Sequence, residues 1–152
     1  MKRLKNYIFP AIVVLGVAVV AFSGRSAETD PEYTYDGEPE VIAATFSAAW
    51  CSTCKILEPR LAGVIPRFAD QPVKFIKLDF TLGERPEVEA LAVREGLSDI
   101  YPRFKGASGF TLLVDRDTGA IIDMLTINHN DRAMRAAIAQ AIAVAAQSGG
   151  GF

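Results

Sequence analysis

The stretch FSAAWCSTCKILEP, Phe46 to Pro59, contains both cysteines of the 152-residue chain, Cys51 and Cys54. Such a pair can be a redox centre, half of a metal site or a structural staple. A staple is disfavoured, because a bridge across so short a loop removes little conformational entropy from the unfolded chain. A closed zinc site is also disfavoured, because it needs four ligands and the chain adds only one histidine, His129, and carboxylates.

Thiol exchange is the chemistry that this spacing suits best. If Cys51 lies at the start of a helix, the unpaired N–H groups and the positive end of the dipole lower the pKa of its thiol. Cys54, one turn later, can then attack a mixed disulfide that Cys51 has formed.

The flanking sequence predicts the strand and the helix that such a site needs. Residues 40–46 are apolar and favour a buried strand, and residues 51–69 carry apolar side chains at helical spacing. The expected core stripe of this helix is Ile56, Leu57, Leu61, Val64, Ile65 and Phe68. Residues 73–80 predict a second strand, and residues 83–96 a short helix.

The last third of the chain predicts a hairpin and a closing helix. Residues 110–127 hold two apolar runs around a turn at Asp117 to Gly119, which is typical of a hairpin. Asn130 is expected to cap an amphipathic helix over residues 131–147. Residues 148–152 are interpreted as a flexible tail. The order of elements predicts an α/β domain with a central mixed sheet flanked by helices.

The first 27 residues have the layout of a secretory signal peptide or a signal anchor. Lys2, Arg3 and Lys5 precede an uninterrupted apolar run, Tyr7 to Phe22, and small and polar residues follow. Both alternatives stay open at this point, and both export the rest of the chain, with residues 28–39 as a linker. Membrane contact is expected only through this first segment. In an oxidising compartment a lone pair of cysteines can also simply be closed.

The charge balance argues against a nucleic-acid partner. The pI is about 5.4 and the net charge is −2, with no run of basic residues outside the N-terminus that could follow a phosphate backbone. Without the four basic residues before position 27, 12 basic residues remain against 18 acidic ones, so the exported part carries about −6.

Five landmarks in order resemble the thioredoxin family over residues 40–147. They are WCSTCK after an apolar strand, Pro59, KLD at the end of the next strand, FTLLVD with its turn glycine, and the closing helix. With an export segment in front, the chain is most similar to the periplasmic or membrane-tethered thioredoxin-like proteins of bacteria. The resemblance implies a thioredoxin-like fold in the periplasm, either free or anchored to the inner membrane.

The resemblance also implies roles for individual residues. Cys51 is expected to be the nucleophile and Cys54 the resolving thiol. Trp50, Phe110 and Ile127 are expected to line the site, and Lys77 to lie beneath it.

Two positions depart from the family pattern. Thr45 stands where many thioredoxins carry a buried acid, and it cannot titrate. Phe110 stands where the family has a cis-proline. Its peptide bond is expected to be trans, because a cis bond before a residue other than proline costs about 3 kcal/mol.

The resulting functional prediction is a thiol-disulfide oxidoreductase that exchanges disulfides with cysteine pairs of envelope proteins and needs no cofactor. If it works as a reductase, a membrane-linked thiol electron donor is the expected partner. One alternative is a non-catalytic Cu(I)-binding protein that uses Cys51, Cys54 and His129. Another is a scaffold whose insertion between Asp79 and Phe110 binds a partner. The sequence predicts neither the redox direction, nor the substrate, nor the oligomeric state.

Overall fold

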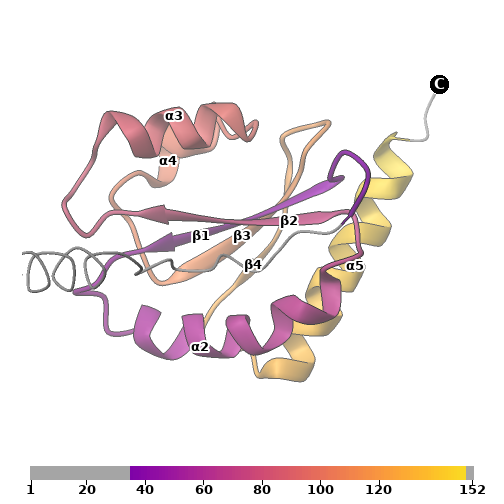
Figure 1. Cartoon of the computed structure of the whole chain (residues 1–152), viewed down its shortest axis with the longest axis horizontal. Helices are drawn as coiled ribbons and strands as arrows, with labels where there is room; N and C mark the ends of the chain where they lie inside the picture. Colours follow the sequence, from indigo (N-terminus) through magenta and orange to yellow (C-terminus); the bar gives the residue numbers. More distant parts are fainter. Residues whose placement is uncertain (1–34, 150–152) are drawn as a thin grey trace, which may run out of the picture. The chain divides into compact units, whose positions relative to one another are not determined.

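The computed structural model describes residues 35–149, which include the whole predicted domain, residues 40–147 (Figure 1). The predicted signal or anchor segment, residues 28–34 of the linker and the last three residues of the tail lie outside the described residues. No helix among residues 35–149 has the length and apolar character needed to cross a membrane.

A four-stranded mixed sheet forms the centre of the domain, in the order β2-β1-β3-β4. Strand β1 (Val41–Ser47) pairs in parallel with β2 (Val73–Asp79) and antiparallel with β3 (Phe110–Asp115). Strand β4 (Ile121–Leu125) completes the predicted hairpin with β3. The predicted α/β fold with a mixed sheet is thus confirmed.

Helices cover both faces of this sheet (Figure 1). On one face lie α2 (Cys54–Val64), its short 3-10 extension η1 (Ile65–Phe68) and the closing helix α5 (Asp131–Gly149). On the other lie α3 (Pro86–Arg94), which has Pro86 in its first turn, and the short α4 (Tyr101–Phe104). Proline is favoured in a first turn because its missing N–H would have no helical partner there.

The alternation of side chains along β1 divides the interior into two cores. All seven residues of β1 are buried, because helices cover the strand on both sides. Ile42, Ala44 and Phe46 pack with residues of α3 and α4, whereas Val41 and Ala43 pack with residues of α2 and α5. The cysteines belong to the first of these cores.

The helices differ from the prediction in their bounds and in one residue of the expected core stripe. Helix α2 begins at Cys54 rather than Cys51, because residues 51–53 form a turn before it. Ile56 is 46% exposed and not part of the core stripe, since it lies about 100° around the helix from the buried Leu57. Helix α5 runs to Gly149, two residues past its predicted end, whereas its predicted cap is confirmed: the Asn130 Oδ1 accepts the Ala133 N–H at 2.9 Å.

Candidate active site

The two cysteines lie beyond the carboxyl ends of the parallel strands β1 and β2, the edge where α/β sheets place their ligands. The Cys51 N–H donates to the Ala48 carbonyl at 3.0 Å and closes the turn between β1 and α2. A hydrogen bond from the Ala49 N–H to the Thr81 Oγ1, 2.9 Å long, ties this turn to the loop after β2.

Asp79 fixes the loop that holds the cysteine turn. Its Oδ1 accepts hydrogen bonds from the Thr81 N–H at 2.8 Å and the Thr81 hydroxyl at 2.5 Å. Burial favours the neutral carboxyl, but these bonds and the nearby charges of Lys77 and Arg85 outweigh it, so the pKa of Asp79 lies below its ordinary value. The ionised carboxylate therefore positions Thr81, and Thr81 positions the cysteine turn.

Cys51 and Cys54 form a disulfide at the N-terminus of α2. The Cys54 backbone N–H, the first of the helix, donates to the Cys51 Sγ at 3.1 Å. The exposed fraction is 6% for Cys51 and 2% for Cys54, so Cys51 is the more accessible of two buried residues. An N–H aimed at this sulfur is the arrangement that stabilises negative charge on it.

Gly109 and Thr53 cover the Cys51 sulfur. The Thr53 Oγ1 lies 3.2 Å from it. Gly109 donates its N–H to the Phe46 carbonyl at 2.8 Å and has a φ of +101°, which side-chain-bearing residues rarely adopt. A Cβ added to Gly109 would meet the Thr53 Oγ1 and lie 3.6 Å from the Cys51 Sγ. The backbone can approach the disulfide this closely only because residue 109 is a glycine.

Phe110 follows this glycine and is a packing residue. No peptide bond among residues 35–149 is cis, so the bond before Phe110 is trans as expected. Its ring stacks on Phe46 at a centroid distance of 4.9 Å and meets Phe104 at 5.7 Å. The residue thus joins the strand that leads to the cysteines with helix α4.

The other two predicted lining residues lie in different surroundings. Trp50 is 64% exposed beside Cys51, and Leu82, in the loop that Thr81 anchors, is 76% exposed, so large apolar side chains are presented to solvent near the disulfide. Ile127 packs against the second core, with residues of α2 and α5, whereas the cysteines belong to the first core.

Thr45 and Lys77 lie side by side in the register of β1 and β2 but make different contacts. Thr45 is buried, and its hydroxyl pairs with that of Thr111 at 2.8 Å. Lys77 turns to helix α2, where its Nζ donates to the Glu58 Oε2 at 3.0 Å. The Glu58 Oε1 accepts a hydrogen bond from Ser47, a buried residue at the end of β1.

The alternative metal site is not assembled among the described residues. No group of three or more histidine, cysteine or acidic residues in residues 35–149 could hold a metal ion. The ring of His129 is instead held within its own loop, where the Nδ1 accepts the Thr126 N–H at 3.2 Å.

Sequence reasoning missed Gly109, Thr53 and Glu58. Glu58 follows Cys54 by one helical turn, so its spacing was a usable indication of a carboxylate on the same side of α2. Gly109 stands directly before the strand of Phe110, and a glycine there is a sign of close backbone approach. Nothing local marked Thr53, whose contact depends on the fold of the turn.

The arrangement of a helix-terminal dithiol beside an α/β sheet defines the class of thiol-disulfide exchange proteins. Residues 33–98, which are 66 of the chain's 152 residues, match the family model described as Thioredoxin, and the described residues form a thioredoxin-like domain. Together with the C-x-x-C disulfide, this domain is that of a protein-disulfide oxidoreductase.

Similar solved structures include StoA from Bacillus subtilis, at 13% identity and a TM-score of 0.46, covering 67% of this chain and 84% of that one. A thiol:disulfide interchange protein of the thioredoxin family from Chlorobium tepidum has 15% identity and a TM-score of 0.46, and the match covers 68% of this chain and 80% of that one. Mitochondrial thioredoxin 3 from Saccharomyces cerevisiae has 22% identity and a TM-score of 0.42, and the match covers 67% of this chain and 79% of that one. No curated protein sequence matched the chain.

Proposed function

We propose that this protein is an exported thiol-disulfide oxidoreductase that exchanges disulfides with cysteine pairs of envelope proteins. The observation that carries the proposal is the bond from the first N–H of α2 to the Cys51 sulfur, because it favours the thiolate at the more accessible cysteine. The exposed Trp50 and Leu82 supply apolar surface beside that sulfur for a polypeptide substrate. The export segment at residues 1–27 is the basis for the envelope location.

The exchange proceeds in two steps. In the reducing direction, the Cys51 thiolate attacks one sulfur of the substrate disulfide, a mixed disulfide forms, and the other substrate sulfur leaves as a thiolate. The Cys54 thiol then loses its proton and attacks the Cys51 sulfur. This forms the Cys51–Cys54 disulfide and releases the second substrate thiolate. Two electrons pass to the substrate, and the oxidising direction is the reverse.

The test follows exchange with a disulfide-bonded reporter protein in the wild type and in two single variants. Cys51→Ala should abolish exchange, whereas Cys54→Ala should accumulate the mixed disulfide, because only the resolving step is lost. The mixed disulfide is detected as a shifted band on a non-reducing gel. Exchange that persists at the wild-type rate in both variants would rule the proposal out.

A further inference from the structure

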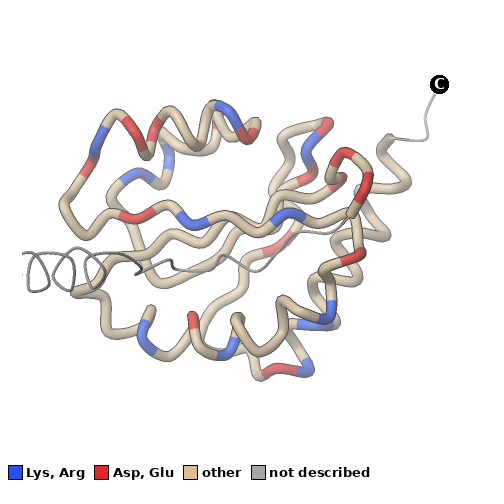
Figure 2. Tube along the Cα trace, viewed as in Figure 1, with Lys and Arg blue, Asp and Glu red and all other residues tan. Residues whose placement is uncertain are grey.

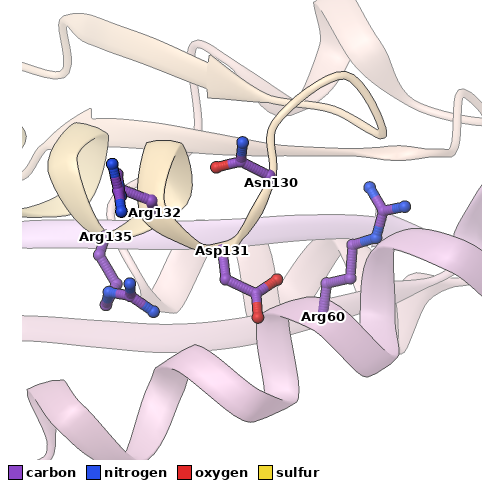
Figure 3. Close-up of a pocket in the computed structure, with 5 residues that line it drawn as sticks. All are labelled: Arg60, Asn130, Asp131, Arg132 and Arg135. Atoms are coloured by element: carbon purple, nitrogen blue, oxygen red, sulfur yellow. The ribbon is translucent and has the colours of Figure 1, made fainter.

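Three arginines gather in an open depression on the face of the domain that carries α2 and α5. The depression has a volume of about 580 Å³ and is lined by Arg60 of α2 and by Asn130, Asp131, Arg132 and Arg135 at the start of α5. Figure 3 shows Asp131 between Arg60 on one side and Arg132 and Arg135 on the other. With three positive groups and one negative group, the lining carries a net charge of +2.

This positive charge is not compensated by ion pairs. Five other cations among residues 35–149 are paired with carboxylates, among them Lys74 with Glu95 and Lys105 with Glu84. Within residues 35–149, none of the three depression arginines forms an ion pair. Figure 2 shows basic segments along the side of the domain that carries α2 and α5, whereas residues 28–152 hold 12 basic against 18 acidic residues.

Arg60 is held in place for a ligand. Its Nη1 donates to the Ile127 carbonyl at 2.9 Å and to the His129 carbonyl at 3.4 Å, so the loop before α5 fixes the guanidinium. A guanidinium has five N–H donors, and the remaining ones form a planar fork that matches a carboxylate. An arginine fixed in this way loses less side-chain entropy when it binds an anion.

The depression lies within the footprint of a protein that reacts at Cys51. Arg60 follows Cys54 by six residues on the same helix, which is about 9 Å of helical rise. A protein partner typically covers about 800 Å² of each surface, which corresponds to a disc about 16 Å in radius. A substrate centred on the disulfide can therefore reach along α2 as far as Arg60, which lines the depression together with Arg132 and Arg135.

We infer that this depression is a docking site for an acidic segment of the substrate protein, close to the cysteine that reacts with Cys51. This inference rests on the proposed function and adds a substrate class to it. Arginines paired with carboxylates at the rim of an interface act mainly on the association rate and on its salt dependence. The protein should thus prefer disulfides flanked by aspartate or glutamate, and the preference should fade at high salt.

The test uses the full-length protein and synthetic disulfide peptides that differ only in their flanks, which are glutamate or glutamine. At low salt, the wild type is expected to reduce the glutamate peptide about tenfold faster than the glutamine peptide. The double variant Arg132→Gln/Arg135→Gln should lose this preference but keep the wild-type rate on the glutamine peptide. The matched control Arg67→Gln/Arg94→Gln removes the same charge outside the depression and should keep the preference.

Binding measured without catalysis separates this inference from the proposed function. Calorimetric titration of Cys51→Ala/Cys54→Ala with the glutamate peptide should show binding that Arg132→Gln/Arg135→Gln removes. If no peptide is reduced but this binding persists, the proposed function fails and the docking site stands. If exchange is intact and the wild type shows no preference, or the double variant keeps it, the docking site is refuted. Arginine-dependent binding to vesicles of anionic phospholipid without peptide preference would also refute it and assign the depression to a lipid surface.

Discussion

Replacing Gly109 by alanine tests whether the close approach of this loop to Cys51 depends on the missing side chain. At a φ of +101°, alanine costs about 1–3 kcal/mol in backbone strain. The added Cβ also meets the Thr53 Oγ1, and overpacking of this kind costs about 1–3 kcal/mol. The expected loss in the free energy of unfolding is therefore about 2–6 kcal/mol. Reduced Cys51 should also become more reactive, because the loop must move away from it.

Urea denaturation separates the backbone strain from the contact with Thr53. The four proteins compared, all in the oxidised state, are the wild type, Gly109→Ala, Thr53→Ala and the double variant. Removing the Thr53 hydroxyl relieves the closest contact of the added Cβ but not the backbone strain. The coupling free energy between the Gly109→Ala and Thr53→Ala substitutions should therefore be roughly 1 kcal/mol or more. Gly63→Ala is the control, because its Cβ meets nothing within 4 Å in a helix, where alanine stabilises by about 0.5–1 kcal/mol. A cost below about 0.5 kcal/mol for Gly109→Ala, or no coupling, would refute the reasoning.

Three further predictions concern the surroundings of the dithiol. Phe110→Pro should lower the free energy of unfolding by about 2–4 kcal/mol, because the ring contacts with Phe46 and Phe104 are lost; an unchanged thermal midpoint would contradict this. Asp79→Asn should destabilise the protein at neutral pH. A carboxylate with a depressed pKa stabilises the fold above its unfolded pKa, near 3.8. The difference in stability between wild type and variant should therefore disappear as the pH falls through the lower folded pKa. Urea midpoints of both proteins at neutral pH and at about pH 3 check this. Glu58→Gln should slow the resolution of the mixed disulfide and alter the pH profile of that rate, whereas Thr45→Val should change neither. Rapid-quench measurements that show equal effects of the two substitutions would exclude a special role for the Glu58 carboxylate.

The elements with local signals were the ones that the sequence could predict. Alternating and apolar runs marked the four strands, a turn ending in glycine marked the hairpin, and Asn130 marked the start of α5. The predicted start of α2 was wrong because residues 51–53 form a turn. The hydrogen bond from the Cys54 N–H to the Cys51 sulfur fixes this turn, and helix propensity takes no account of such a bond. The expected roles of Cys51 and Cys54 came from their spacing and from the resemblance to the thioredoxin family, and neither depends on the exact first residue of the helix.

Contacts between distant segments were beyond reach of the sequence. The charge analysis found no basic run outside the N-terminus, yet the fold brings Arg60 to the start of α5, where two further arginines lie. Lys77 was expected near the site, but its partner Glu58 comes from a helix rather than from a neighbouring strand. The same holds for Phe110, whose packing depends on the short helix α4.

With Thr45 at the position where many thioredoxins carry a buried acid, the carboxylate one helical turn after Cys54 is that of Glu58. The hydroxyls of Thr45 and Thr111 pair with each other within the sheet, and neither can supply a titrating carboxylate there. Lys77, the neighbour of Thr45 in the register, reaches out to Glu58, one turn after Cys54 and a third exposed. A carboxylate in contact with water is screened by salt, whereas a buried one is screened much less. If Glu58 helps to remove the Cys54 proton, the resolving step should therefore depend on ionic strength, which a buried acid at position 45 would not produce.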